Sequence, residues 1–372
     1  MSRTTHDGLL RRLWVDRLKP WVDVFDGPLL LAMAVLLLVS LTVQYSAAFD
    51  FPGRFEGHLR NIGIAMIAMW AAALVPPVRL MRLGLPLYLV GLILIVAVAL
   101  FGVTNKGAQR WLDLGFTRIQ PSEIMKLAVP LLLAWYFQQR DGWLRARDYA
   151  VAALMLVVPV LLVAKQPDLG TAILVLAAGA YVIFFAGLSW KVIAGLLTAG
   201  LASLPLLWMV MHDYQRQRVL TLIDPGADPL GKGFHIIQSI IAVGSGGWFG
   251  KGWMDGTQTH LEFIPERTTD FILAVHAEEF GLAGLIFLMG IYLAIIFRGL
   301  SIAAAAQSLF GRLLAAAITL SFFTYCFVNM GMVIGLLPVV GVPLPWMSYG
   351  GTAMVTLGLG AGMLMSISRH RT

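Results

Sequence analysis

Long runs without charge dominate this sequence and limit what it can fold into. Four of them, residues 27–49, 83–105, 169–190 and 192–211, contain no Asp, Glu, Lys or Arg. Each is long enough to form a membrane helix of about 20 residues. The chain as a whole is 59% hydrophobic and 13% charged, with a mean hydropathy of +0.80, which lies outside the range of soluble domains. The sequence therefore predicts a protein embedded in a bilayer.

Shorter or weakly interrupted apolar runs complete a set of ten predicted spans. They lie near residues 28–48, 60–77, 83–102, 121–138, 148–164, 170–187, 191–211, 270–297, 311–336 and 351–367. The prediction is an all-α polytopic membrane protein with one domain, residues 1–372, and one large loop, residues 212–269, between the seventh and eighth helices. Cys326 is the only cysteine, so no disulfide framework is expected. The first span is too long for a cleavable signal peptide and is expected to remain as a helix.

The net charge of +7 is distributed as the positive-inside rule requires rather than as a nucleic-acid-binding surface. Basic residues before the first span and after even-numbered spans predict that both termini are cytoplasmic. The opposite loops nevertheless also carry cations: Lys106, Arg110, Arg118, Lys165, Arg216, Arg218, Lys232, Lys251 and Arg267. We expect this outer face to handle an anion, with contacts to lipid headgroups by snorkelling side chains as the alternative.

Two motifs place charged residues at predicted helix starts. In "RWLDLGFTRIQPSEIMK", residues 110–126, Glu123 and Lys126 are three apart and can pair on one helix face. Such a pair can be purely structural, although ionisable residues at membrane depth favour a functional role. In "KQPDLGTA", residues 165–172, Lys165 and Asp168 occupy a tight turn. Asp168 is typical of a helix cap, and a cap there would still direct a carboxylate to the outer face.

The stretch "PERTTDFILAVHAEEFG", residues 265–281, carries four carboxylates at the start of an apolar helix. Asp270 lies near the predicted N-terminus, where the helix dipole favours an anion, and simple capping is the alternative role. Glu278 and Glu279 lie about 80° and 180° around the helix from Asp270. We expect one of them to face the same cavity as Asp270 and the other to bind another helix. His276 is expected to pack, because no second His or Cys stands at metal-ligand spacing.

The last motif, "NMGMVIGLLPVVGVPLPWMSYGGTAM", residues 329–354, contains no charge. Its prolines and glycines predict a broken or re-entrant link at residues 337–350. Irregular backbone at membrane depth must line protein or a watery cavity. Ser348 and Tyr349 supply uncharged polar groups there.

Together these motifs resemble the SEDS family (shape, elongation, division and sporulation). The C-terminal signature of that family is matched by Pro338, Gly341, Pro343, Ser348, Gly350 and Gly351. The motifs at residues 110–126, 165–172 and 265–281, with the glycine-rich "QSIIAVGSGGWFGKG" at 238–252, extend the resemblance over essentially the whole chain. Residues 261–279 are more similar to the RodA branch than to the FtsW branch. Thr268 departs from the pattern, since many relatives carry histidine there, so no role of that histidine is expected here.

The resemblance implies a peptidoglycan glycosyltransferase that polymerises lipid II at the outer face of the bacterial inner membrane during cell elongation. Outer-face cations beside a buried acid suit such a pyrophosphate-linked sugar independently. The hypothesis makes Asp270 the general base, and substrate is expected to contact Arg110, Gln120, Glu123, Lys126, Lys165, Asp168, Glu266, Arg267 and Ser348.

The resemblance also implies partners: a class B penicillin-binding protein and other membrane proteins of the elongation complex. A divalent cation, Mg or Mn, between pyrophosphate and acid stays open, without a dedicated metal site in the sequence. Two other function classes also stay open. A lipid II flippase would place polar sites through both leaflets, and a non-catalytic scaffold for a penicillin-binding protein would tolerate neutralised acids and cations.

Overall fold

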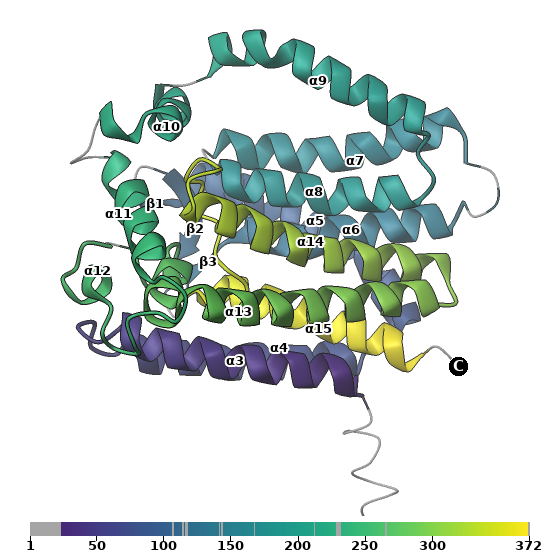
Figure 1. The fold of residues 1–372 in the computed structure, drawn as a ribbon. Coiled ribbons are helices and arrows are strands. Elements are labelled where there is room, and N and C mark those ends of the chain that lie inside the picture. The colour runs from purple at the N-terminus through teal and green to yellow at the C-terminus, as the bar shows by residue number, and fades with distance from the viewer. Residues whose placement is uncertain are drawn as a thin grey trace, which may run out of the picture.

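The computed structural model describes residues 24–370 apart from 106–107, 114, 116–117, 141, 143, 167, 212, 228–231 and 265. Within these residues the chain is mostly helical, and its long helices form one elongated bundle (Figure 1). They are α3 (Gly27–Ala47), α4 (Arg54–Ala73), α5 (Pro77–Phe101), α6 (Pro121–Gln138), α7 (Ala146–Lys165), α8 (Leu169–Phe185), α9 (Trp190–Val210), α13 (Ile272–Ala305), α14 (Leu309–Val333) and α15 (Gly351–Arg369).

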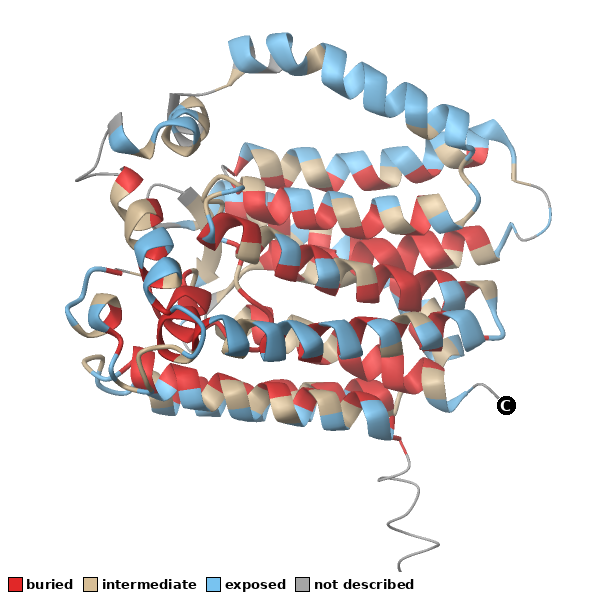
Figure 2. Ribbon diagram, viewed as in Figure 1, coloured by how far each residue is buried: buried red, intermediate tan, exposed pale blue. Residues whose placement is uncertain are grey.

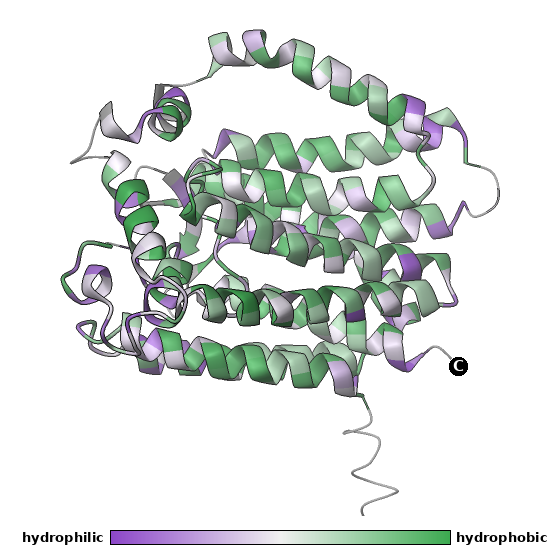
Figure 3. Ribbon diagram, in the orientation of Figure 1, coloured by the Kyte–Doolittle hydropathy of each residue, from purple (hydrophilic) through white to green (hydrophobic). Residues whose placement is uncertain are grey.

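Each predicted span overlaps one of these helices. Six of them, α3, α5, α7, α13, α14 and α15, are long and apolar enough to cross a membrane, and shorter apolar helices accompany them. Hydrophobic residues follow the middle of the helices and hydrophilic residues gather toward their ends (Figure 3). The chain is therefore a multi-pass helical membrane protein.

The prediction of an all-α chain was wrong in the loop after α5. There β1 (Val103–Asn105), β2 (Ala108–Asp113) and β3 (Arg118–Ile119) form a small antiparallel sheet in the order β1-β2-β3. Strands of two to six residues are too short to show the alternation by which a strand is read from sequence.

The two ends of the bundle differ (Figure 1). The chain enters and leaves the described bundle at one end. The opposite end, called here the strand end, carries the sheet together with α10 (Asp213–Ile223), η2 (Pro225–Ala227), α11 (Lys232–Ser245) and α12 (Thr257–His260).

Burial is concentrated in the middle of the bundle (Figure 2). Helix α6 is buried along most of its length because α5, α8 and α14 pack around it. Helix α9 lies at the edge and exposes most of its residues. Charged residues on α6 therefore sit in the interior, where only protein groups or a cavity can satisfy them.

Helix α13 is interrupted at Gly281, whose φ of 64° is accessible mainly to glycine. The glycine-rich turn at residues 246–250 packs against the interruption. The amides of Leu282 and Ala283 donate to the carbonyls of Gly247 and Trp248 at 2.9 and 3.0 Å. A Cβ on Gly281 would lie only 2.3 Å from the Gly250 nitrogen, so no other residue fits without a shift.

Residues 334–350, called here the link, join α14 to α15 without helix. The link runs inside the bundle, since Val342, Leu344 and Trp346 are buried. Side chains of neighbouring helices satisfy its carbonyls: Ser40 donates to Trp346 O at 2.6 Å and Tyr292 to Pro345 O at 2.9 Å. This is how irregular backbone is accommodated at membrane depth.

Candidate active site

A polar cavity of about 340 Å³ opens at the strand end of the bundle. Strand β2, helices α6 and α8, the residues before α13 and the link all contribute to its wall. Most of the predicted site residues line it: Arg110, Gln120, Glu123, Lys126, Asp168, Glu266 and Asp270. Segments distant in sequence thus bring acids and cations into one space.

Asp270 is half-buried and lies two residues before α13 begins. The N-cap of α13 is Phe271, which makes no side-chain capping hydrogen bond. The link passes beside its carboxylate at Gly341, whose φ is 71°; a Cβ there would lie 3.7 Å from Asp270 Oδ2. The Asp270 carboxylate therefore lies beside the Gly341 backbone and also lines the cavity.

Lys126 forms the pair with Glu123 that their spacing predicted, with Nζ to Oε1 at 2.7 Å. The same ammonium donates to the Tyr325 hydroxyl at 2.6 Å, and both charged residues are about 5% exposed. Tyr325 was missed by sequence reasoning, because a lone tyrosine in a charge-free span gives no signal of its neighbours. These three side chains fix a cation at the inner wall of the cavity.

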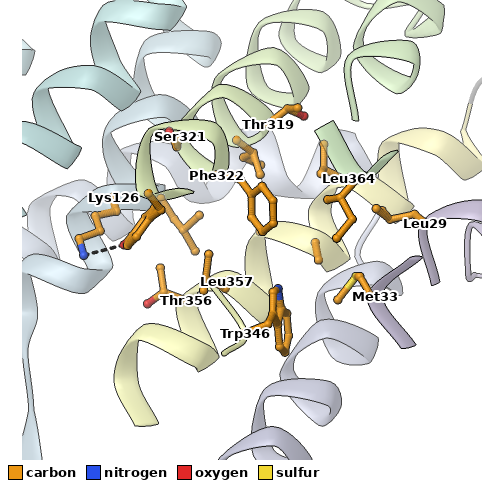
Figure 4. A pocket seen from close by; sticks show the side chains of 16 residues that line it. Leu29, Met33, Lys126, Thr319, Ser321, Phe322, Trp346, Thr356, Leu357 and Leu364 are labelled. Carbon is orange, nitrogen blue, oxygen red and sulfur yellow. Dashed lines mark hydrogen bonds between the residues drawn. The ribbon is translucent and has the colours of Figure 1, made fainter. Parts of the chain in front are cut away.

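Beside this ammonium lies a second space of about 50 Å³, lined mainly by apolar side chains (Figure 4). Lys126 lines both spaces, while Phe322, Trp346 and Leu364 line only the second one. This apolar lining lowers the local dielectric beside Lys126 and so strengthens the charge interactions there.

Asp168 caps α8 and also lines the cavity. Its Oδ1 caps α8 by accepting from the amide of Thr171 at 3.2 Å. Its Oδ2 accepts from Gln120 at 2.9 Å, and Arg110 lies 3.7 Å from Oδ1. Arg110 remains 30% exposed, so it faces the cavity as well as Asp168.

Three predicted site residues do not line the cavity. Arg267 is 2% exposed; it donates to Ala47 O at 2.9 Å and pairs with Asp50. Ser348 donates to Thr269 O at 2.6 Å. Lys165 is also absent from the cavity wall. Neighbouring residues in a turn direct their side chains to different sides. Arg267 therefore points toward Ala47 and Asp50, while Asp270, three residues later, lines the cavity.

The expectation that Glu278 or Glu279 faces this cavity was wrong. Glu278 is fully buried beneath residues 251–259, where Lys251 Nζ donates to it at 2.7 Å. Glu279 binds the hydroxyl of Ser46. His276 packs on Phe280, with 5.1 Å between ring centroids.

The described residues contain no group of three or more His, Cys, Asp or Glu arranged to hold a metal ion. Of the predicted outer-face cations, Lys106 lies outside the described residues, and so do the side chains of Arg118, Arg218 and Lys232.

An apolar groove of about 800 Å³ continues from the polar cavity between α4, α5, α6 and α15. Leu83, Leu87 and Leu359 are typical of its lining, while Trp111 and Gln120 belong to both spaces. A ligand with a charged head and a long hydrocarbon tail matches this combined shape.

Helical bundle, polar cavity and apolar groove define a class: a polytopic membrane protein with a charge-lined cavity at one end that continues into an apolar groove. Residues 24–372 match the FtsW, RodA and SpoVE family, described as cell cycle protein. The chain belongs to this family, which confirms the resemblance drawn from its motifs.

Named relatives cover nearly the whole chain. Peptidoglycan glycosyltransferase MrdB of Escherichia coli K12 is 51% identical over 93% of this chain and 94% of its own length. MrdB of Helicobacter pylori is 36% identical over 93% and 88%.

Solved structures share the fold. The rod shape determining protein RodA of Thermus thermophilus superposes with a TM-score of 0.72 at 30% identity, covering 93% of this chain and 97% of that one. A chain from a peptidoglycan synthase complex described as coordinating polymerization and crosslinking gives a TM-score of 0.81 at 33% identity, covering 93% and 98%.

Proposed function

We propose that this protein is a peptidoglycan glycosyltransferase that polymerises lipid II into glycan strands during cell elongation. The observation that carries the proposal is the cavity that joins Asp270 to Arg110 and Lys126 and continues into an apolar groove. The 51% identity to a peptidoglycan glycosyltransferase over most of both chains supports the same activity.

The two spaces match the two halves of lipid II. Its pyrophosphate and disaccharide are polar and anionic, and its prenyl tail is apolar. We place the headgroup in the cavity, near Arg110 and Lys126, and the tail in the groove. Trp111, Gln120 and Glu123 lie where the two spaces meet, beside the junction of head and tail.

In the reaction, Asp270 accepts the proton of the acceptor sugar's 4-hydroxyl. The oxygen attacks the anomeric carbon of the donor, a new glycosidic bond forms with inversion, and the bond from that carbon to the pyrophosphate breaks. The lipid pyrophosphate leaves with the electron pair. Lys126 and Arg110 stabilise its developing charge, while Glu123 and Tyr325 hold Lys126 in place.

We further propose that ten helices span the bacterial inner membrane, with both termini cytoplasmic and the strand end periplasmic. The positive-inside rule supports this orientation. A class B penicillin-binding protein is the proposed partner within the elongation complex, because a solved chain of the same fold belongs to a peptidoglycan synthase complex.

The test is polymerisation of purified lipid II by the purified chain, with and without the penicillin-binding protein. Asp270→Asn should abolish glycan synthesis, while Asp224→Asn, at an exposed acid of the strand end, should leave it intact. Normal glycan length and rate in Asp270→Asn would remove Asp270 from the chemistry. Headgroup translocation by that inactive variant would instead favour a flippase.

A further inference from the structure

The backbone that carries Asp270 is held by side chains from α3, α14 and the link. Residues 266–270, called here the Asp270 turn, precede α13 and present successive carbonyls to the core. Thr268 O accepts from Gln44 Nε2 at 2.7 Å. Thr269 O accepts from the Ser348 hydroxyl at 2.6 Å, and Asp270 O accepts from Asn329 Nδ2 at 2.9 Å.

Two of these donors bridge the turn to the link. Gln44 Nε2 also donates to Met347 O at 3.1 Å, and Asn329 Nδ2 also donates to Val342 O at 2.8 Å. A carboxamide carries two N–H bonds, so each side chain can serve one carbonyl on either side. The turn and the link are thereby joined at two points by side chains from α3 and α14.

Both amides act as donors in this arrangement. Gln44 and Asn329 are 0% exposed, and neither amide oxygen has a hydrogen-bond partner among the described residues. Rotating either amide would place its oxygen against two carbonyl oxygens, so the observed orientation is the favourable one. Each group therefore retains an unpaired oxygen while its N–H bonds bind backbone.

We propose that Gln44 and Asn329 are positioning residues of the polymerisation reaction, which tie the Asp270 turn to the link and so fix the direction of the Asp270 carboxylate. The link supplies the cavity wall at Gly341 and Val342, next to that carboxylate. The Asp270 carboxylate and the cavity wall at Gly341 and Val342 therefore hold a fixed position relative to each other. This inference rests on the proposed function, and it assigns Gln44 and Asn329 no contact with substrate.

The expected effect is on turnover rather than binding. Cation contacts to the headgroup come from β2 and α6, which neither amide touches, whereas a small displacement of a catalytic base is costly. Asn329→Leu and Gln44→Met replace each amide by an apolar side chain of similar size. We expect each to lower kcat by about tenfold to a hundredfold and to leave KM for lipid II within about threefold.

A structural readout accompanies the kinetics. Hydrogen exchange at residues 268–272 should be faster in both variants, because the turn loses one of its ties. Tyr88→Phe is the matched control: it removes a buried hydroxyl that donates to Met155 O at 2.8 Å, between α5 and α7 and away from the turn. It should change stability but leave kcat per folded molecule within about twofold, since neither reacting group moves.

Wild-type kcat in monodisperse Asn329→Leu or Gln44→Met would overturn the inference. Should Asn329→Leu not fold, Asn329→Ser retains one donor, and an unchanged kcat in that variant would overturn it equally. The underlying function is tested separately. An active Asp270→Asn contradicts the proposed base, whereas an inactive Asp270→Asn with fully active amide variants contradicts only the positioning role.

Discussion

Asp270 and Glu278 lie eight residues apart near the start of α13 but differ in burial and in their surroundings. Asp270 is half-buried and lines a cavity that also contains Arg110 and Lys126. Glu278 is fully buried and accepts hydrogen bonds from Lys251 and from residues 257–259. The fully buried acid is thus enclosed by hydrogen-bond donors.

This difference shows that burial of a carboxylate does not by itself indicate a functional role. A buried carboxylate surrounded by donors is held ionised but has no room to accept a proton from a substrate. Asp270 lines a cavity together with Arg110 and Lys126, which suits the general-base role proposed for it. The Glu278 cluster instead secures residues 251–259 to the bundle.

The largest expected effect is the loss of activity without loss of stability in Asp270→Asn. Removing a general base lowers the rate by about 10²–10⁴-fold. The unfolding temperature should stay near that of the wild type, because the amide remains partly solvated. Polymerisation rate and thermal unfolding of the same preparation measure the two quantities. A parallel fall in both would make Asp270 structural, like Glu278.

Glu278→Gln should show the reverse behaviour. The change leaves the Lys251 ammonium without its counter-charge, although Lys251 is 26% exposed and can recruit water. We expect a stability loss of about 2–3 kcal/mol, below the range for fully buried pairs. The polymerisation rate per folded molecule should stay at the wild-type value. Denaturant unfolding of the same preparation measures the loss of stability. A thousandfold rate loss with normal stability would contradict the division between the two acids.

Much of the fold could be predicted because charge-free runs of spanning length leave a chain few choices. The same reasoning predicted a broken link at residues 337–350, where prolines interrupt apolar sequence. It could not orient side chains within turns. Arg267 stands three residues before Asp270, yet its guanidinium packs between Phe49 and Phe51, with 5.0 and 4.8 Å to the ring centroids.

The candidate site was accessible from sequence only where spacing fixes geometry. Glu123 and Lys126 lie three apart on one helix, so their pairing followed from helix geometry. Tyr325 comes from α14, and only the three-dimensional packing brings it 2.6 Å from Lys126. Gln44 and Asn329 are likewise polar residues within apolar spans. Gln44 binds carbonyls more than two hundred residues away, and Asn329 binds the carbonyl of Asp270, 59 residues before it, and that of Val342 within the link.

A smaller effect is expected when Lys126 loses its hydrogen bond to the Tyr325 hydroxyl. Tyr325→Phe removes the hydroxyl but keeps the ring, which lies 4.9 Å from the ammonium. A hydrogen bond to a charged group contributes about 1.5–3 kcal/mol, so we expect about a tenfold fall in kcat/KM. Tyr88→Phe is again the control. An unchanged kcat/KM would show that Glu123 alone suffices to hold Lys126.

The smallest effect concerns the ion pair of Arg267 and Asp50, outside the spans. Partial burial acts to raise the pKa of the Asp50 carboxyl, but the hydrogen bond and charge of Arg267 lower it more, so its pKa lies below the ordinary value of 3.8. The folded state therefore binds this proton more weakly than the unfolded state. The pair stabilises the fold above about pH 4 and loses this contribution as pH falls through the lowered pKa.

Asp50→Asn tests this contribution directly. The Arg267 side chain is only 2% exposed, so the substitution leaves a buried guanidinium without its counter-charge. The amide oxygen of the new Asn can still accept from Arg267, and Phe49 and Phe51 still flank the guanidinium, so we expect a stability loss of about 1 kcal/mol near neutral pH. The difference from the wild type should shrink as the pH is lowered through the acid range, measured as unfolding temperature against pH. A difference that stays constant would mean that the substituted amide fails for reasons of shape rather than charge. Arg267 precedes Asp270 by three residues. If polymerisation per folded molecule also falls in Asp50→Asn, the ion pair would help to position the Asp270 turn.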